Sequence, residues 1–184
     1  MMALMVLLGP SVFAEDGFNC LTNGDFEVES VENSVMPAGW FPFTSKIITM
    51  ELSPAMVKSG GRGLKVAVQG MKDASQGLAQ IIPVEGGATY IFSVWARNSK
   101  ESPLSKGACG TLYIEWKNSS GKEISRERSR DWDMSLSRMR WESFSVAGKA
   151  PRDATQAAFS IAFYDGQRGG VGMCFVDEAR VEVK

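Results

Sequence analysis

Two acidic residues far apart in the chain, Glu27 and Asp177, stand beside alternating apolar residues and could share a cation. Glu27 ends an early run of Asn, Gly, Asp, Phe and Glu, and Asp177 lies in the last apolar segment. If the two ends of the chain are neighbours in one sheet, the two carboxylates meet there. The alternative is that both acids are solvated, or paired with Arg62 or Lys65.

Catalytic chemistry finds little support in the sequence. It contains no histidine, which removes the commonest general base and every Ser–His or Cys–His pair. Asp131 and Asp133 could in principle serve as the two carboxylates of a glycoside hydrolase. Acids in loops are, however, common on solvated surfaces, and no other catalytic signature accompanies this pair. We therefore predict that the protein is not an enzyme.

Trp95 fits a ligand platform best among the aromatic residues. Between residues 89 and 97, apolar residues alternate with a second row that contains Ser93, Trp95 and Arg97. Sugars offer C–H faces that pack on aromatic rings and hydroxyl groups that bond to polar side chains, so a sugar site needs both residue types together. This row predicts a carbohydrate platform. The alternative is that a loop covers Trp95.

Alternation assigns further side chains to the same face. Trp132 stands in the charged stretch 126–133, where no apolar periodicity explains a buried ring, so it is predicted as a second platform or, alternatively, as a plug beneath the loop. The remaining candidates are Gln80, Tyr113, Glu115, Ser160 and Tyr164. An error of one residue in register would move any of them to the opposite face.

The elements that must position these residues read as β-strands. Helix signals are scarce, although a short helical turn near residues 53–58 or 134–138 is conceivable, and period-two segments separated by Gly, Pro, Asn and Ser predict an all-β sandwich. The expected strands are Gly63–Val68, Leu78–Val84, Thr89–Arg97, Thr111–Lys117, Trp141–Val146, Ala157–Tyr164 and Met173–Val183.

Several of these segments, taken in order, resemble a known family. They are Asn23–Glu27, Gly39–Trp40, Ser59–Val66, Thr89–Arg97, Trp141–Phe144 and Phe175–Asp177. The set resembles the carbohydrate-binding modules of families four, nine and twenty-two, which are galactose-binding-like jelly rolls. The resemblance implies a jelly-roll β-sandwich of two antiparallel sheets, one of them concave. Trp40, Trp116 and Trp141 are expected in its core.

The resemblance also implies a structural calcium ion near the chain ends. Carried over by position, its ligands are the side chains of Glu27 and Asp177 and the backbone carbonyls of Asp25 and Gly63, all oxygen donors of the kind that calcium requires. The sequence departs from the family at Gly60, where an additional acid is common. A site with two carboxylates should bind calcium more weakly than one with three.

The function that follows is non-catalytic binding of a polysaccharide or oligosaccharide. Stacking on Trp95 and Trp132 and hydrogen bonds from Arg97, Gln80, Glu115 and Tyr164 would hold the glycan. The loop 71–76 lacks an aromatic residue that some sugar-binding relatives carry there. The alternative is a structural or adhesion module that mediates protein contacts at the cell envelope, and a partner enzyme or envelope protein is compatible with either.

Residues 1–14 predict a signal peptide, because an apolar run too short to span a bilayer precedes a small-residue cleavage site. Residues 15–184 then form a single domain, secreted or periplasmic. The formal net charge of −1 gives no basic face for nucleic acid, and no later segment predicts membrane insertion. Cys20, Cys109 and Cys174 allow one disulfide at most, or are three small buried thiols.

Overall fold

Ten strands and no helix make up the described part of the computed structural model, which covers residues 18–43, 48–70, 74–165 and 169–184. The strands are β1 (Phe41–Phe43), β2 (Ile48–Ser53), β3 (Gly63–Gln69), β4 (Ala74–Pro83), β5 (Thr89–Asn98), β6 (Ala108–Lys117), β7 (Glu123–Arg128), β8 (Glu142–Lys149), β9 (Gln156–Asp165) and β10 (Val171–Val183). The predicted signal peptide lies outside the described residues. These residues contain no helix long and apolar enough to cross a membrane.

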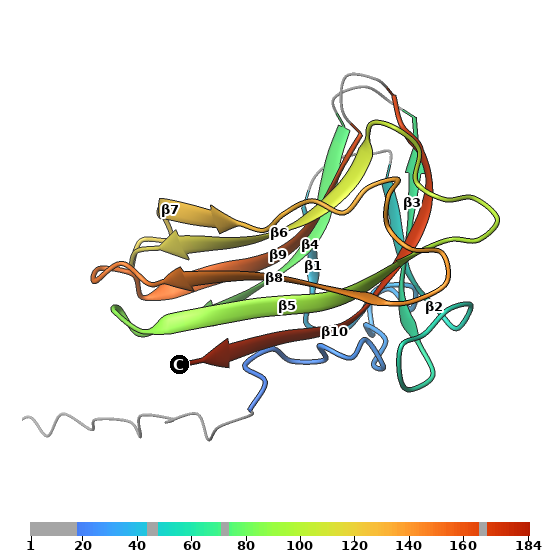
Figure 1. Cartoon of the computed structure of the whole chain (residues 1–184). Coiled ribbons are helices and arrows are strands. Elements are labelled where there is room, and N and C mark those ends of the chain that lie inside the picture. The colour runs from blue at the N-terminus through green and yellow to red at the C-terminus, as the bar shows by residue number, and fades with distance from the viewer. Residues whose placement is uncertain (1–17, 44–47, 71–73, 166–168) are drawn as a thin grey trace, which may run out of the picture.

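The strands form two antiparallel sheets that pack face to face (Figure 1). Sheet I has the order β1-β4-β9-β6-β7, and sheet II has the order β2-β3-β10-β5-β8. Every pairing between neighbouring strands is antiparallel. The predicted all-β, jelly-roll sandwich is therefore confirmed.

Alternation along the central strands builds the core between the sheets. In β5, every second residue from Tyr90 to Ala96 is buried, as the sequence predicts. Phe92 meets Phe159 of β9 edge to face, with ring centroids 5.6 Å apart. Trp40 and Trp116 are buried as expected, whereas Trp141 is only half-buried. Burial of these large side chains is the main driving force of the fold.

The two ends of the chain lie side by side, as expected. The backbone N–H of Cys20 donates to the carbonyl of Val181 (2.9 Å), and the N–H of Ala179 donates to the carbonyl of Gly24 (2.7 Å). Gly24 is required at this point, because a Cβ there would lie 2.1 Å from the Ala179 oxygen. Glu178, at a positive φ of 54°, marks a bulge in β10 that receives the N-terminal segment.

The run Asn23–Glu27 is a backbone clamp. The amide nitrogen of Asn23 donates to the carbonyls of Val28 and Ala38, at 2.9 and 3.0 Å. Phe26 is fully buried, and its ring centroid lies 5.3 Å from that of Trp40. All three cysteines are free thiols, so the alternative without a disulfide is the one observed.

Candidate functional site

The outward face of sheet I is hollowed along its middle strand, β9. Phe159, Ile161 and Phe163 fill the core, so the alternate residues of β9 face outward. Three of these outward residues are small, namely Ala158, Ser160 and Ala162. The neighbouring strand β4 continues this row with Gly77 and Ala79, and longer side chains come from β6 on one flank and from β1 on the other. The small residues therefore form the floor of a shallow depression, called here the trough.

The trough contains a pocket of about 310 Å³. It is lined by Phe41, Pro42, Phe43, Ala79, Ile81, Glu115, Lys117, Ala158 and Ser160. One wall, from β1 and β4, is therefore apolar, and the other wall, from β6, is polar. An apolar surface opposite a few convergent polar groups is the usual composition of a small-molecule or cofactor site.

The apolar wall depends on two phenylalanines in the short edge strand β1. Phe41 pairs in register with Ala79, and Phe43 with Gly77. The ring of Phe43 covers Gly77, where a Cβ would lie 2.2 Å from the ring. Phe41 is 53% exposed, although it is large and apolar. The wall thus presents aromatic surface to solvent rather than to the core.

The polar wall carries cations and carboxylates in balanced pairs. The Glu115 carboxylate forms ion pairs with Lys117 (3.6 Å) and Arg126 (3.7 Å). Arg126 also binds Glu123 through two nitrogens, each at 2.7 Å. These pairs hold the long side chains of β6 and β7 in fixed positions along the edge of the trough.

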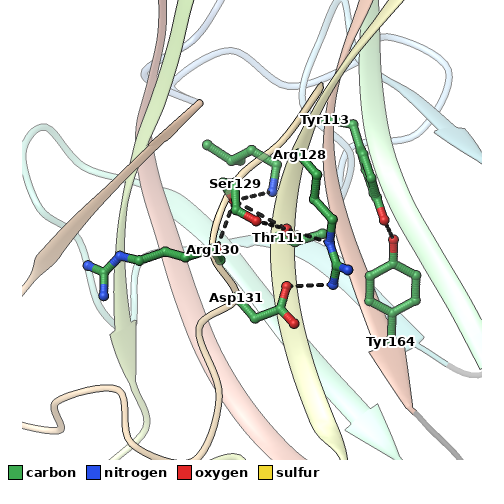
Figure 2. Close-up of polar contacts among 8 residues, drawn as sticks. Thr111, Tyr113, Arg128, Ser129, Arg130, Asp131 and Tyr164 are labelled. Carbon is green, nitrogen blue, oxygen red and sulfur yellow. Dashed lines mark hydrogen bonds and ion pairs between the residues drawn. The ribbon is translucent and has the colours of Figure 1, made fainter. Parts of the chain in front are cut away.

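At one end of the trough, two tyrosines and an arginine form a cluster (Figure 2). The hydroxyl groups of Tyr113 and Tyr164 hydrogen-bond to each other. The Arg128 guanidinium lies 5.9 Å from the Tyr113 ring centre and 5.8 Å from that of Tyr164, within cation–π range. It donates to Asp131 (2.6 Å) and to the Thr111 hydroxyl (3.4 Å). Burial first, and then the bond with Tyr113, raise the pKa of Tyr164 above its usual value, so its hydroxyl keeps its proton.

Trp132 fixes this cluster from below. Its side chain is 1% exposed and packs on Phe163 and Phe144, with centroids 5.6 and 4.9 Å apart. Its backbone exchanges two hydrogen bonds with Gly110, at 2.8 and 2.9 Å. Of the two predictions for Trp132, a ligand platform is wrong and the alternative, a plug beneath the loop, is the one observed. The plug instead places the adjacent Asp131 beside Arg128.

Only part of the predicted site comes together. Tyr113, Glu115 and Tyr164 lie on the outward face of sheet I, as one set. Gln80 does not join them, because it faces the core and exchanges two hydrogen bonds with the backbone of Thr22. Gln80 was expected on the outward face of its strand but lies on the inward face, which is the error that a one-residue shift in register produces.

Trp95 and Arg97 lie on the outward face of the other sheet, sheet II. The Lys58 ammonium lies 4.4 Å from the Trp95 ring centre, and Trp95 is half-buried. The Nε and Nη2 atoms of Arg97 donate to the carbonyl of Arg138, at 3.2 and 3.1 Å. The expectation that Trp95 and Arg97 share one platform with Tyr113 is therefore wrong. Trp95 and Arg97 lie on the outward face of sheet II, whereas Tyr113 lies on the outward face of sheet I.

The residues expected to bind calcium hold a loop through N–H donors. Glu27 Oε1 accepts from the backbone N–H groups of Gly61 (2.8 Å) and Arg62 (3.1 Å). Asp177 Oδ2 accepts from those of Lys58 (2.7 Å) and Ser59 (3.4 Å). Both acids thus meet the same loop from opposite ends of the chain.

The alternative ion pairs for these acids are not the ones observed. Arg62 pairs with Glu29, and Lys65 pairs with Glu51. Within the described ranges, no group of three or more His, Cys, Asp or Glu residues is placed to hold a metal ion. The expected calcium ligands are only two carboxylates together with two backbone carbonyls. The absence of a larger acidic group therefore does not test this set, and calcium stays a prediction.

Sequence reasoning missed Phe41, Phe43 and the two arginines of β7. The two phenylalanines alternate around Pro42 directly after the core residue Trp40, which is a period-two signal too short to be assigned a face. Arg126 and Arg128 alternate in the same way with Glu127. Their position follows only from the pairing of Tyr113 with Arg128.

Several solved structures share this fold. The enzymatically active domain of bacteriophage CBA120 tailspike protein 4 superposes with a TM-score of 0.67 at 13% identity, over 90% of this chain and 21% of that chain. TmCBM61, solved in complex with β-1,4-galactotriose, gives 0.60 at 14% identity over 91% of this chain and 99% of that one. A xylan-binding domain from CBM 22 gives 0.58 at 18% identity, over 92% and 97%.

No protein-family model and no curated protein matches the chain. At such low identities, the structural matches establish the fold. The resemblance to galactose-binding-like carbohydrate-binding modules is confirmed at that level. This chain spans only a fifth of the tailspike chain, whereas it spans nearly all of the two binding modules.

Proposed function

We propose that the chain is a non-catalytic carbohydrate-binding module that holds a glycan in the trough of sheet I. The observation that carries this proposal is the pairing of an aromatic wall with a polar wall across a floor of small residues, within one pocket. Sugar rings need this combination, because their C–H faces pack on aromatic carbon while their hydroxyl groups seek polar partners. Two structurally similar modules carry galactotriose or xylan in their names.

In this arrangement, Phe41 and Phe43 pack against the C–H face of the sugar. Glu115 and Lys117 exchange hydrogen bonds with its hydroxyl groups, since both already face the pocket. Tyr113 and its partner Tyr164 lie further along the same face. A glycan longer than one sugar therefore reaches the tyrosine cluster.

Binding without catalysis is supported by the contacts that Asp131 and Asp133 make. A glycoside hydrolase needs two carboxyl groups that flank the scissile bond from opposite sides. Here Asp131 is bonded to Arg128 (2.6 Å), and Asp133 accepts from the hydroxyl and N–H of Ser135, at 2.7 and 2.9 Å. Each acid is thus engaged in holding its own loop.

Affinity electrophoresis in soluble xylan and in soluble galactan tests the proposal. The native chain should be retarded by at least one of the two polysaccharides. Phe41→Ala should weaken the retardation about tenfold if the ring contributes as a typical aromatic anchor. A matched control is Ile124→Ala, which removes an exposed apolar side chain from β7. Equal retardation of Phe41→Ala and the native chain would reject this site.

We further propose that a calcium ion binds weakly between Glu27 and Asp177. An ionised carboxylate has about four lone-pair sites. The backbone N–H groups occupy two sites on Glu27 and three on Asp177, counting the bond from the Glu178 N–H at 2.8 Å. Oxygen lone pairs therefore remain for a cation, but few. Millimolar calcium should raise the Tm and a chelator should lower it, and an unchanged Tm would reject the ion.

We also propose that the protein is exported after removal of residues 1–14. The apolar character of this segment supports export. N-terminal sequencing of the protein from its native source should begin near Glu15. Recovery of a chain that retains residues 1–14 would contradict the proposal. A partner enzyme or envelope protein stays a prediction.

A further inference from the structure

Residues that pair in register across sheet I form rungs that cross its strands. On the outward face, neighbouring rungs lie two residues apart, which is about 7 Å. One rung joins Phe41, Ala79, Ser160 and Tyr113, and the first three of these residues line the pocket. The next rung, called here the Ala162 rung, joins Phe43, Gly77, Ala162 and Thr111. What covers this rung decides whether the trough continues past the pocket.

The two tyrosines cover the Thr111 side of the Ala162 rung. Tyr113 stands one rung before it and Tyr164 one rung after it, so their Cα atoms lie about 13 Å apart along the strands. The ring centroids are only 6.5 Å apart, and the hydroxyl groups bond to each other. Both side chains therefore lean over the rung from opposite sides, with their hydroxyl groups directed at each other (Figure 2). Arg128 covers the same side, because its Nε donates to the Thr111 hydroxyl (3.4 Å).

Phe43 covers the β4 side of the Ala162 rung. Its ring lies on Gly77, its partner in register, and fits there only because Gly77 has no side chain. Gly77 is buried, Ala162 is 2% exposed and Thr111 is fully buried. The described side chains thus form a barrier across this rung, from β1 to β6.

The pocket ends at this barrier and extends in the opposite direction. Of the Ala162 rung, only Phe43 lines the pocket, whereas the lining on β6 continues past Glu115 to Lys117. Lys117 is the last residue of β6 and pairs with Gln156, the first residue of β9, so sheet I ends there. The connections before β9 and after β4 lead to β8 and β5 of sheet II, away from the outward face. The trough is therefore closed at one end and open at the other.

We propose that the trough takes the end of a glycan chain and rejects the interior of a chain. The terminal sugar packs against the tyrosine pair and Phe43, and the rest of the chain leaves past Lys117. The open part is four residues long, about 13 Å, which accommodates about two sugar rings in line. A chain interior would have to continue across the Ala162 rung, where it would clash with the rings. The inference rests on the proposed function, because it concerns the same trough.

Sedimentation of the native chain with linear xylan and linear galactan, each fractionated by length, tests the proposal by counting the protein molecules on each glycan chain. Binding at the chain end predicts one protein per glycan chain at every length. Calorimetry should then show a molar affinity that changes by less than about twofold once the glycan is longer than the trough.

The outcomes separate this inference from the proposed function. Several proteins on each long chain, in a number that grows with chain length, would overturn the inference and leave glycan binding in the trough intact. Absence of binding to both glycans at every length would reject the proposed function, and this inference with it.

Tyr164→Ala tests the barrier itself. The variant removes one ring over the Ala162 rung, so a glycan chain should pass and long chains should carry more than one protein. The control is Phe18→Ala, which removes a 60% exposed ring from the N-terminal segment beside sheet II and should keep one protein per chain. Thermal melting reports whether each variant is folded, and Phe43→Ala serves if Tyr164→Ala is not. A folded barrier variant that binds glycan yet keeps one protein per chain at every length would overturn the proposal.

Discussion

The hydroxyl groups of Tyr113 and Tyr164 hydrogen-bond to each other across β6 and β9, above the outward face of sheet I (Figure 2). The two strands are neighbours, yet Tyr113 pairs in register with Ser160 rather than with Tyr164. The bond therefore runs diagonally and draws both rings over one end of the trough. Arg128 lies within cation–π distance of both rings, so three planar groups converge at the point where the polar wall ends.

Tyr164→Phe should weaken glycan binding by about threefold to tenfold, since it removes one hydrogen-bonding hydroxyl from this cluster.

The near-ultraviolet absorbance should report the ionisation of the Tyr164 hydroxyl as the pH is raised. The pKa of Tyr164 is raised, so the folded state binds the hydroxyl proton more tightly than the unfolded state does. The stability that the protonated Tyr164 contributes is therefore complete below about pH 10 and is lost as the pH rises further. The difference between the native chain and Tyr164→Phe isolates this titration, and a midpoint at or below about pH 10 in the folded protein would contradict the raised pKa.

Gly110→Ala should destabilise the fold by about 1–3 kcal/mol, because the new methyl group overpacks a filled core. A Cβ at residue 110 would lie 2.3 Å from the Trp132 indole. Glycan binding should fall as well, since Trp132 positions Asp131. Gly61→Ala is the control, because its Cβ meets only Glu27 Oε2, at 3.5 Å. Urea unfolding of both variants measures the difference, and equal stabilities would contradict the role of the plug.

Asp177→Asn should cost about 1.5–3 kcal/mol of stability in the presence of a chelator. The carboxylate is fully buried and accepts hydrogen bonds from the backbone N–H groups of Lys58, Ser59 and Glu178. In the variant, the side-chain amide nitrogen is itself a hydrogen-bond donor, so the backbone N–H group that it faces loses its acceptor. Glu51→Gln, which breaks the half-exposed pair with Lys65, should cost less than about 1 kcal/mol. Similar losses in the two variants would mean that the loop is not held by Asp177.

Cys109 should report occupancy of the trough by its rate of alkylation. Burial, and to a lesser extent the Asp131 carboxylate, raise the pKa of this thiol to about 11. The thiolate is the reactive form, so the rate with iodoacetamide should be low at neutral pH and should rise toward pH 11. Cys109 pairs with Tyr164 on the outward row of β6, so a bound glycan should slow the reaction. An unchanged rate at saturating glycan would place the ligand elsewhere.

The fold could be predicted from the sequence because its signals are local and repeated. Every second residue of β5 from Tyr90 to Ala96 is apolar and buried, and the same holds for Leu112, Ile114 and Trp116 of β6. The meeting of the chain ends could be inferred from matching patterns at Glu27 and Asp177. The bulge at Glu178 that makes room for the N-terminal segment has no comparable signal, since its positive φ belongs to a residue that seldom adopts one.

The site could be predicted only in part, because alternation gives the face of a strand but not the sheet to which that strand belongs. Tyr113 and Trp95 both lie on outward rows, yet on opposite sides of the sandwich. The charged neighbours of Trp132 leave two alternatives, a surface platform or a plug beneath the loop. Asp131 and Asp133 alternate around it, however, and this pattern points the indole inward. Gln80 had no such signal, since its partner is the backbone of Thr22 in the N-terminal segment.

Calorimetric titration of Tyr113→Ala and Trp95→Ala with the polysaccharide that retards the native chain tests the central claim most directly. Tyr113 lies on the trough face, whereas Trp95 lies on sheet II beneath Lys58. Glycan binding in the trough predicts that Tyr113→Ala loses about tenfold or more in affinity and that Trp95→Ala binds like the native chain. Loss of binding in Trp95→Ala, with native affinity in Tyr113→Ala, would contradict the account.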